Sequence, residues 1–252
     1  MSAGLVSRHG RGGAKPSTKS RLTKAACLLA CIGSGWAVLA ATAQAATIKG
    51  NVRFTGTVVQ PKALAVTSDR YVCGEYKDAQ DLIVSADRGI RNAVVSLETP
   101  PPGAKWYGFG PPPQIDQNEC VFIPRVVLVP VGGTMEFLNS DRLLHNIRSR
   151  NIKHNRAFNR TQPRARTIPI TFAKSEIVQV GCDLHSWMRS WVVVADHPFY
   201  TITGDDGEFT LGNVPPGRYT LEVWQEVLGT VTMEITVGNE SVTDVTIEMD
   251  TP

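Results

Sequence analysis

The stretch GCDLHSWM, residues 181–188, carries three side chains that can bind a soft metal ion. They are Cys182, His185 and Met188, each three residues after the one before. Thiolate and thioether sulfur select copper or zinc, and imidazole suits both metals. On a tight loop between two strands, this spacing lets all three point at one centre. The spacing alone is a weak signal, because Cys and Met are also common in hydrophobic cores.

A second imidazole is needed to complete such a site. Beyond the first 45 residues the chain has four histidines, namely His145, His154, His185 and His197. His145 lies just past a predicted strand, in FLNSDRLLHNI. We interpret His154 and His197 as ordinary surface or packing residues. Zinc is the rival metal, but a thioether ligand argues against it.

The first 45 residues predict a secretory leader. Six Lys or Arg precede an apolar run at 25–40, small residues follow, and the first acidic residue is Asp69. This order is that of a signal peptide, with cleavage expected after Ala45. The run is shorter than the roughly 20 apolar residues that a membrane span needs. We therefore expect a periplasmic or secreted protein with no membrane span after processing.

Removal of the leader changes the sign of the net charge. Six of the 26 Lys and Arg leave, so 20 remain against 23 Asp and Glu, a net charge of about −3. Net charge therefore does not favour a nucleic-acid partner. Residues 148–169 contain seven Lys or Arg and no acid. We interpret them as a solvated loop, with a basic rim that steers an acidic redox partner as the alternative.

Three cysteines remain after the leader, namely Cys73, Cys120 and Cys182. In an oxidising compartment two of them can pair and one is left over. Cys182 is the one surrounded by ligand-type side chains. We therefore predict a disulfide between Cys73 and Cys120 and a free thiol at Cys182.

The elements that would position these residues are short strands separated by Gly, Pro, Asn and Asp, which predicts an all-β protein. RVVLVPVGGTMEFLN (125–139) predicts two strands around a Gly-Gly turn. EIVQVGC leads a strand into Cys182, and SWVVVAD leads another away from Met188. No helical period of useful length is present. The Pro- and Gly-rich run at 99–114 cannot continue a strand ladder and predicts an extended connector.

The C-terminal sequence TGDDGEFTLGNVPPGRYTLEV resembles the carboxypeptidase regulatory-like, transthyretin-like β-sandwich modules. Their usual first half, G-x-V … G … A-x-V-x-L, occurs far upstream, within 50–56 and 93–97. The resemblance implies one small sandwich split in two. Its N-terminal half with the connector would cover 46–114 and its C-terminal half 197–252, with 115–196 inserted between them. Two domains in tandem are the alternative.

The inserted region resembles the cupredoxins, which are small blue copper proteins with a Greek-key β-sandwich. VPVGGTMEFLNSDRLLHNI and VGCDLHSWMRSWVVV carry the resemblance. The Cys-x2-His-x2-Met spacing is that of amicyanin, and bacterial proteins labelled as methylamine-utilisation-like share the whole pattern. The resemblance implies one type 1 copper ion. Its strong ligands would be His145, Cys182 and His185, and its weak axial ligand Met188.

The same resemblance implies roles for the neighbours of the ligands. Asn146 would hydrogen-bond the sulfur through its backbone N–H and clamp the two ligand loops with its side chain. Electrons would pass through the ring of His185 at the surface, with Trp187 as an apolar contact beside it. Asp183, which places a charge beside the thiolate, departs from the family pattern.

Together these features favour a one-electron carrier over an enzyme. Copper oxidases and nitrite reductases need further centres built from many histidines, which four cannot supply. The sequence contains no Ser/His/Asp set, phosphate-binding loop or haem-attachment motif. We expect a protein redox partner, such as a dehydrogenase, a cytochrome or an oxidase. A non-catalytic module for copper delivery, copper storage, adhesion or carbohydrate binding is the alternative.

Overall fold

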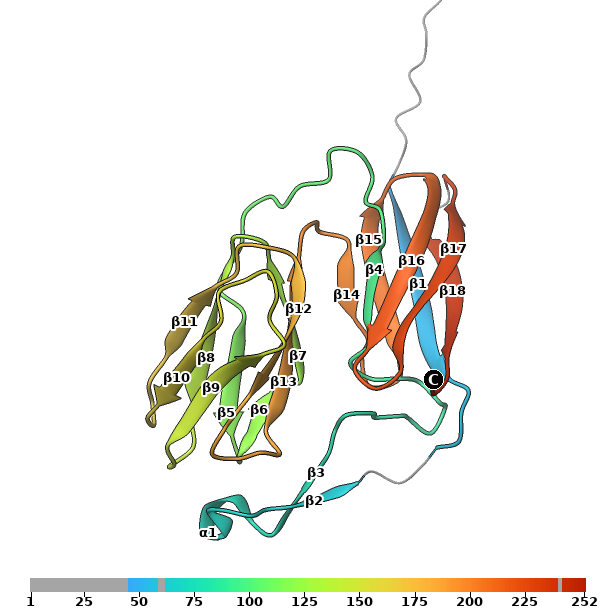
Figure 1. The fold of residues 1–252 in the computed structure, drawn as a ribbon. Coiled ribbons are helices and arrows are strands. Elements are labelled where there is room, and N and C mark those ends of the chain that lie inside the picture. The colour runs from blue at the N-terminus through green and yellow to red at the C-terminus, as the bar shows by residue number, and fades with distance from the viewer. Residues whose placement is uncertain (1–44, 59–61, 240–241) are drawn as a thin grey trace, which may run out of the picture. The chain divides into compact units, whose positions relative to one another are not determined.

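The computed structural model describes residues 45–58, 62–239 and 242–252, so the predicted leader lies outside the described residues. As predicted, the described chain is all-β apart from one four-residue helix (Figure 1). Within the described residues, no helix is long and apolar enough to cross a membrane.

Strands from both ends of the chain form two sheets around one apolar core, which includes the fully buried Ile48, Val95 and Leu221. One sheet has the order β15–β1–β18, from β1 (Ala46–Phe54), β15 (Glu208–Val214) and β18 (Val242–Met249). The other has the order β14–β4–β16–β17, from β4 (Val94–Leu97), β14 (Tyr200–Ile202), β16 (Gly217–Gln225) and β17 (Gly229–Val237). Strand pairing thus joins chain segments that lie before and after the central region.

The central region folds as a second pair of sheets around a core that includes Phe122, Phe137 and Val192. One sheet has the order β11–β8–β5–β6, from β5 (Gln114–Asn118), β6 (Val121–Ile123), β8 (Thr134–Asn139) and β11 (Ile168–Thr171). The other has the order β10–β9–β12–β13–β7, from β7 (Val126–Pro130), β9 (His145–Arg150), β10 (Asn159–Gln162), β12 (Glu176–Gly181) and β13 (Arg189–Ala195). The central region is thus a β-sandwich of a four-stranded and a five-stranded sheet, as predicted.

A small excursion between β1 and β4 lies against the central sandwich. Residues 62–78, called the strap below, contain a hairpin of β2 (Ala63–Ala65) and β3 (Tyr76–Asp78), with the helix α1 (Arg70–Cys73) between its strands. A disulfide joins Cys73 to Cys120, with their sulfur atoms 2.06 Å apart, and confirms the predicted pairing. Val66 of the strap is fully buried in the central core.

The basic stretch 148–169 is not the single solvated loop that its charge suggested. It contains β10, which pairs with β9 at the edge of the five-stranded sheet. Charged side chains there are exposed, whereas Phe158 and Gln162 are buried. Gln162 is held inside because its Nε2 donates to the carbonyl of Phe137 at 2.7 Å. The charged residues of this stretch suggested a loop, but the buried side chains of Phe158 and Gln162 pack it against the central sandwich.

Candidate metal centre

Two neighbouring antiparallel strands of the five-stranded sheet bring predicted ligands together at one end of the sheet, where β9 begins and β12 ends. His145 is the first residue of β9, and Cys182 follows the last residue of β12. The two strands pair with Gly181 opposite Arg148. Because the two strands run in opposite directions, the start of β9 and the end of β12 lie side by side at the same end of the sheet. His185 follows on the turn that leads into β13.

The three strongest predicted ligands converge in the structure. His145 Nδ1 and His185 Nδ1 lie 2.9 Å apart, and Cys182 Sγ lies 3.9 Å from the first and 3.7 Å from the second. Donors to one ion, at bond lengths of about 2.0 Å for nitrogen and 2.3 Å for sulfur, can lie up to roughly 4.3 Å apart. All three separations satisfy that limit, and the three side chains are at most 1% exposed. The donor set therefore fits one metal ion.

Met188, the predicted axial ligand, lies in the same buried cluster as Cys182. Its backbone N–H donates to the carbonyl of His185 at 3.0 Å, which closes the turn that carries these ligands. Two imidazoles, a thiolate and a thioether are the set typical of a type 1 copper site. Cys120, Asp141 and His145 also lie close together. They are no rival site, because the sulfur of Cys120 is held in the disulfide.

Each histidine of the centre hydrogen-bonds a carboxylate through its outer nitrogen. His145 Nε2 lies 2.8 Å from Asp141 Oδ2, and His185 Nε2 lies 2.9 Å from Asp69 Oδ2. A carboxylate at Nε2 keeps the proton there and leaves Nδ1 free to bind metal, and it makes the imidazole more basic. Sequence reasoning missed both acids. Asp141 stands four residues before His145, which is a local signal, whereas Asp69 is 116 residues from His185 and gave none.

Contacts within the centre favour the ionised forms of its thiol and imidazole. Burial opposes protonation of His145, but its hydrogen bonds to Asp141 and Cys182 outweigh burial and raise its pKa to about 9. Burial also opposes ionisation of Cys182. Hydrogen bonds from the two imidazoles and from the backbone N–H groups of Asn146 and Leu184 outweigh it and lower the pKa of Cys182 to about 6. The thiolate, which is the form that binds metal, is therefore favoured near neutral pH.

Asn146 connects the two ligand loops. Its Oδ1 accepts a hydrogen bond from the backbone N–H of Asp183 at 2.6 Å, immediately after Cys182. Its Nδ2 donates to Asn159 Oδ1 at 2.8 Å and to Asp183 Oδ2 at 3.2 Å. The side chain thus lies where the resemblance predicted a clamp, and β10 takes part in it through Asn159.

The charge of Asp183 is balanced by arginines of β9. Its carboxylate lies 3.2 Å from Arg148 and 2.8 Å from Arg150. Burial slightly opposes ionisation of Asp183, but the hydrogen bond and charge of Arg148 and the charge of Arg150 keep its pKa below the ordinary value. Gly181 leaves room for this pairing, because a Cβ there would lie 2.7 Å from Arg150 Nε.

The expected surface position of His185 and Trp187 is corrected by the structure. His185 is 0% exposed and Trp187 is 6% exposed. Asp69 of the strap covers the outer edge of the His185 ring, and Trp187 Nε1 donates to the carbonyl of Cys120 at 2.9 Å. The large apolar side chains that do reach the surface on the ligand loops are Leu144 and Leu184, each about half exposed.

The remaining histidines lie outside the centre. His154 is exposed, and its backbone N–H is bound by Glu176. His197 is buried, and its ring lies against those of Phe199 and Tyr200.

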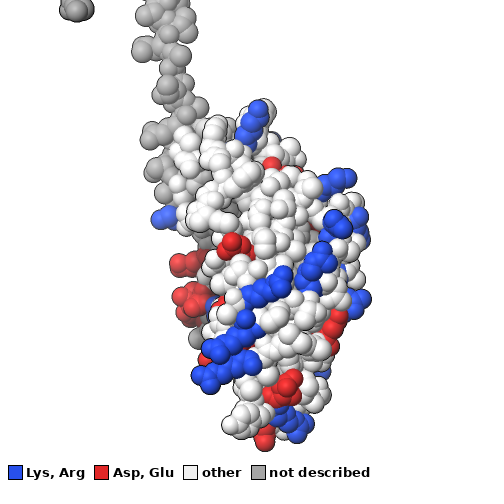
Figure 2. All heavy atoms as spheres, turned by 90° about the vertical axis from the view of Figure 1, so that its left-hand side faces the viewer, with Lys and Arg blue, Asp and Glu red and all other residues white. Residues whose placement is uncertain are grey.

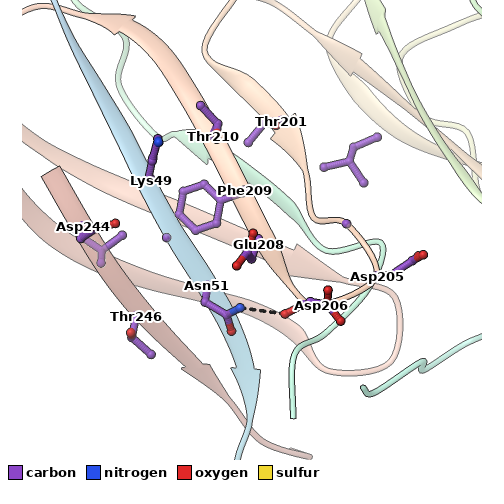
Figure 3. A pocket seen from close by; sticks show the side chains of 14 residues that line it. Lys49, Asn51, Thr201, Asp205, Asp206, Glu208, Phe209, Thr210, Asp244 and Thr246 are labelled. Atoms are coloured by element: carbon purple, nitrogen blue, oxygen red, sulfur yellow. Dashed lines mark hydrogen bonds between the residues drawn. The ribbon is translucent and has the colours of Figure 1, made fainter. Parts of the chain in front are cut away.

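An open hollow of about 910 Å³ lies on the other sandwich and has no ligands for a soft metal (Figure 3). Its lining is polar and includes Lys49, Asn51, Asp206 and Glu208. Asn51 Nδ2 donates to the carbonyl of Asp206 at 2.7 Å. None of the residues that line it is His, Cys or Met. Among the described residues, both groups of His, Cys and Asp side chains that could hold a metal ion lie in the central sandwich.

The C-terminal part is similar to a known family of domains. Residues 191–250 match the family model described as the carboxypeptidase regulatory-like domain. The match begins within β13, the last strand of the central sandwich, and continues to β18. A search of curated proteins found no match.

Several solved structures resemble part of this chain. A purple cupredoxin from Nitrosopumilus maritimus is 22% identical and covers 33% of this chain and 99% of its own, with a TM-score of 0.29. An oxidised amicyanin mutant is 19% identical and covers 40% of this chain and 98% of its own, with a TM-score of 0.32. The copper-containing nitrite reductase of Thermus scotoductus SA-01 is 23% identical over 34% of this chain, with a TM-score of 0.32, and the alignment covers 22% of the reductase.

Proposed function

We propose that this protein is a type 1 copper protein that carries single electrons between redox partners. The observation that carries the proposal is the meeting of His145 Nδ1, His185 Nδ1 and Cys182 Sγ in a buried space, with mutual distances of 2.9 to 3.9 Å. Two imidazoles and a thiolate, with a methionine in the same cluster, form a donor set that selects copper.

Zinc fits this donor set less well. Structural zinc sites use four sulfur, nitrogen or carboxylate ligands, and catalytic ones keep an open position for water. Here the nearby carboxylates of Asp69 and Asp141 are engaged by the outer nitrogens of the two histidines. The fourth donor from the ligand turn is the thioether of Met188, a soft ligand that suits copper.

The surroundings of the centre suit electron transfer better than catalysis. Bound copper would supply a one-electron change of oxidation state. The chain holds the donors in fixed positions, because Asn146 ties the two ligand loops together and Asp69 and Asp141 each fix one imidazole. Rigid donors move little between oxidation states, which favours fast transfer. Full burial of His145 and His185 leaves no path for a substrate to reach the donors.

We further propose a periplasmic or secreted location and a protein redox partner, such as a dehydrogenase, a cytochrome or an oxidase. The disulfide between Cys73 and Cys120 supports the location, because disulfides persist in oxidising compartments. The redox partner follows from the carrier function and from the absence of space for a substrate at the buried ligands.

The experiment that tests the proposal is copper loading of the purified protein. We expect an intense blue colour from sulfur-to-copper charge transfer, which is lost on reduction and returns on oxidation. Cys182→Ser should abolish the colour, whereas His154→Ala, which removes an exposed histidine outside the centre, should retain it. A copper-loaded protein that stays colourless would contradict the carrier function and favour copper delivery or storage.

A further inference from the structure

A basic surface adjoins the proposed copper centre. Residues 142–175 contain nine Lys or Arg and no acid, whereas the rest of the chain after residue 45 has 11 Lys or Arg against 23 Asp and Glu. The charges are therefore segregated, although the net charge after residue 45 is about −3. Figure 2, which faces the side of β10 and β11, shows a band of Lys and Arg side chains.

Four arginines of this segment are free to meet a partner. They lie on β10 or within four residues of its ends, they are exposed, and among the described residues none forms an ion pair. We call them the basic face: Arg156, Arg160, Arg164 and Arg166. Arg160 lies on the edge strand β10, and Gln162 Nε2 donates to the carbonyl of Arg166 at 2.6 Å, so the backbone is held in place at these two arginines.

The basic face is connected to the ligands by short contacts. β10 pairs with β9 so that Gln162 lies opposite His145. Asn159 Nδ2 donates to the carboxylate of Asp183 at 3.2 Å, and Asp183 follows Cys182 in the chain. A partner bound at this face would therefore lie within a few residues of two proposed copper ligands.

A partner cannot contact the ring of His185 directly. The strap covers the outer edge of His185 through Asp69, and Ser68 Oγ donates to the carbonyl of Leu184 at 3.1 Å. The side chains of Leu144 and Leu184 nevertheless remain about half exposed. These two side chains offer an apolar contact surface next in sequence to the ligands His145 and His185.

We propose that the basic face, with Leu144 and Leu184 beside it, is the docking surface for an acidic redox partner protein. This inference rests on the proposed function, since it names the chemistry of the partner. Complementary charge raises the rate of encounter and orients the partner, while the apolar contact excludes water where electrons cross. A nucleic acid could also meet a basic surface, but the overall acidic chain and the adjoining redox centre favour a protein.

The test compares charge reversal on the basic face with the same reversal elsewhere. The basic-face variant is Arg156→Glu, Arg160→Glu and Arg164→Glu. The control is Lys49→Glu, Arg53→Glu and Arg218→Glu, three exposed positions of the other sandwich that change the net charge equally. The probe is a fluorescent deca-glutamate peptide, with binding followed by anisotropy at low salt. We expect binding to weaken at least tenfold in the basic-face variant and less than twofold in the control.

A kinetic assay measures the same surface with a small anion. Ferricyanide takes one electron from the reduced, copper-loaded protein and becomes ferrocyanide. We expect this rate to fall about tenfold in the basic-face variant and to lose most of its dependence on salt, because steering by charge is screened by salt. Replacing the same three arginines by lysine keeps the charge and should preserve both binding and rate.

Three results would overturn the inference. They are equal losses in the basic-face variant and the control, failure of the unmodified protein to bind the peptide, and tighter, basic-face-dependent binding of a single-stranded oligonucleotide. The peptide assay does not depend on copper. If the loaded protein is colourless but peptide binding still depends on the basic face, the proposed function fails and the acidic docking surface stands.

Discussion

Asp69 should set the reduction potential of the centre from outside the ligand set. Its carboxylate lies 2.9 Å from His185 Nε2 and makes that imidazole a stronger donor. A stronger donor stabilises the more highly charged, oxidised ion. Asp69→Asn keeps the shape of the side chain but removes its charge, so it should raise the reduction potential while the blue colour remains.

The size of this effect follows from the exposure of Asp69. Removal of an outer hydrogen-bond partner of a metal ligand typically costs 10- to 100-fold in metal affinity. The Asp69 side chain is 47% exposed, so solvent screens its charge. We therefore expect a loss of copper affinity at the low end of that range, about tenfold. If the tenfold loss falls mainly on the oxidised state, the potential rises by about 59 mV for one electron.

Cyclic voltammetry of the copper-loaded protein measures this shift directly. Asp78→Asn is the matched control, because Asp78 is an exposed acid of the same strap with no contact to the centre. A potential that falls in Asp69→Asn, or that moves equally in the control, would refute the role of Asp69. Loss of the blue colour in Asp69→Asn would also contradict it, because no ligand has been removed.

Three further predictions concern the supports of the centre. Asp141→Asn should raise the potential more than Asp69→Asn does, because the Asp141 side chain is only 7% exposed and is screened less; voltammetry that orders them the other way would contradict this. Replacement of both Cys73 and Cys120 by Ser opens a link across 47 residues, which should lower the free energy of unfolding by about 4 kcal/mol in urea titrations and leave the colour intact. Glu176 accepts hydrogen bonds from the backbone of residues 153–155, which outweigh its burial and lower its pKa below the ordinary 4.5. The stabilising effect of Glu176 should therefore be complete above about pH 4.5 and lost as the pH falls through its lower folded-state pKa. Glu176→Gln should accordingly unfold more easily than the unmodified protein at pH 7 and match it in strong acid.

Local patterns were enough to predict the strands that carry the ligands. RVVLVPVGGTMEFLN forms β7 and β8 with a Gly-Gly turn between them, and SWVVVAD forms most of β13. Their apolar, β-branched runs specify buried strands regardless of what lies far away. The edge strand β10 does not follow from its sequence, because Gln162 is its one buried residue and charged residues surround it.

The outer contacts of the centre could not be predicted, because they join distant parts of the chain. Ligand type and spacing indicated Cys182, His185 and Met188, and the resemblance to the cupredoxins added His145. The strap could not be predicted from its sequence, because a short hairpin with one turn of helix shows no periodicity over a useful length. Its position depends on the disulfide and on Asp69, and this tertiary contact is what buries His185 against expectation.

X-ray absorption at the copper edge, on protein loaded with one equivalent of copper, tests the central claim most directly. It should show one sulfur at about 2.2–2.3 Å and two imidazole nitrogens at about 2.0 Å, with little change on reduction. The sulfur signal should vanish in Cys182→Ser. Copper surrounded only by nitrogen and oxygen in the unmodified protein would contradict the account.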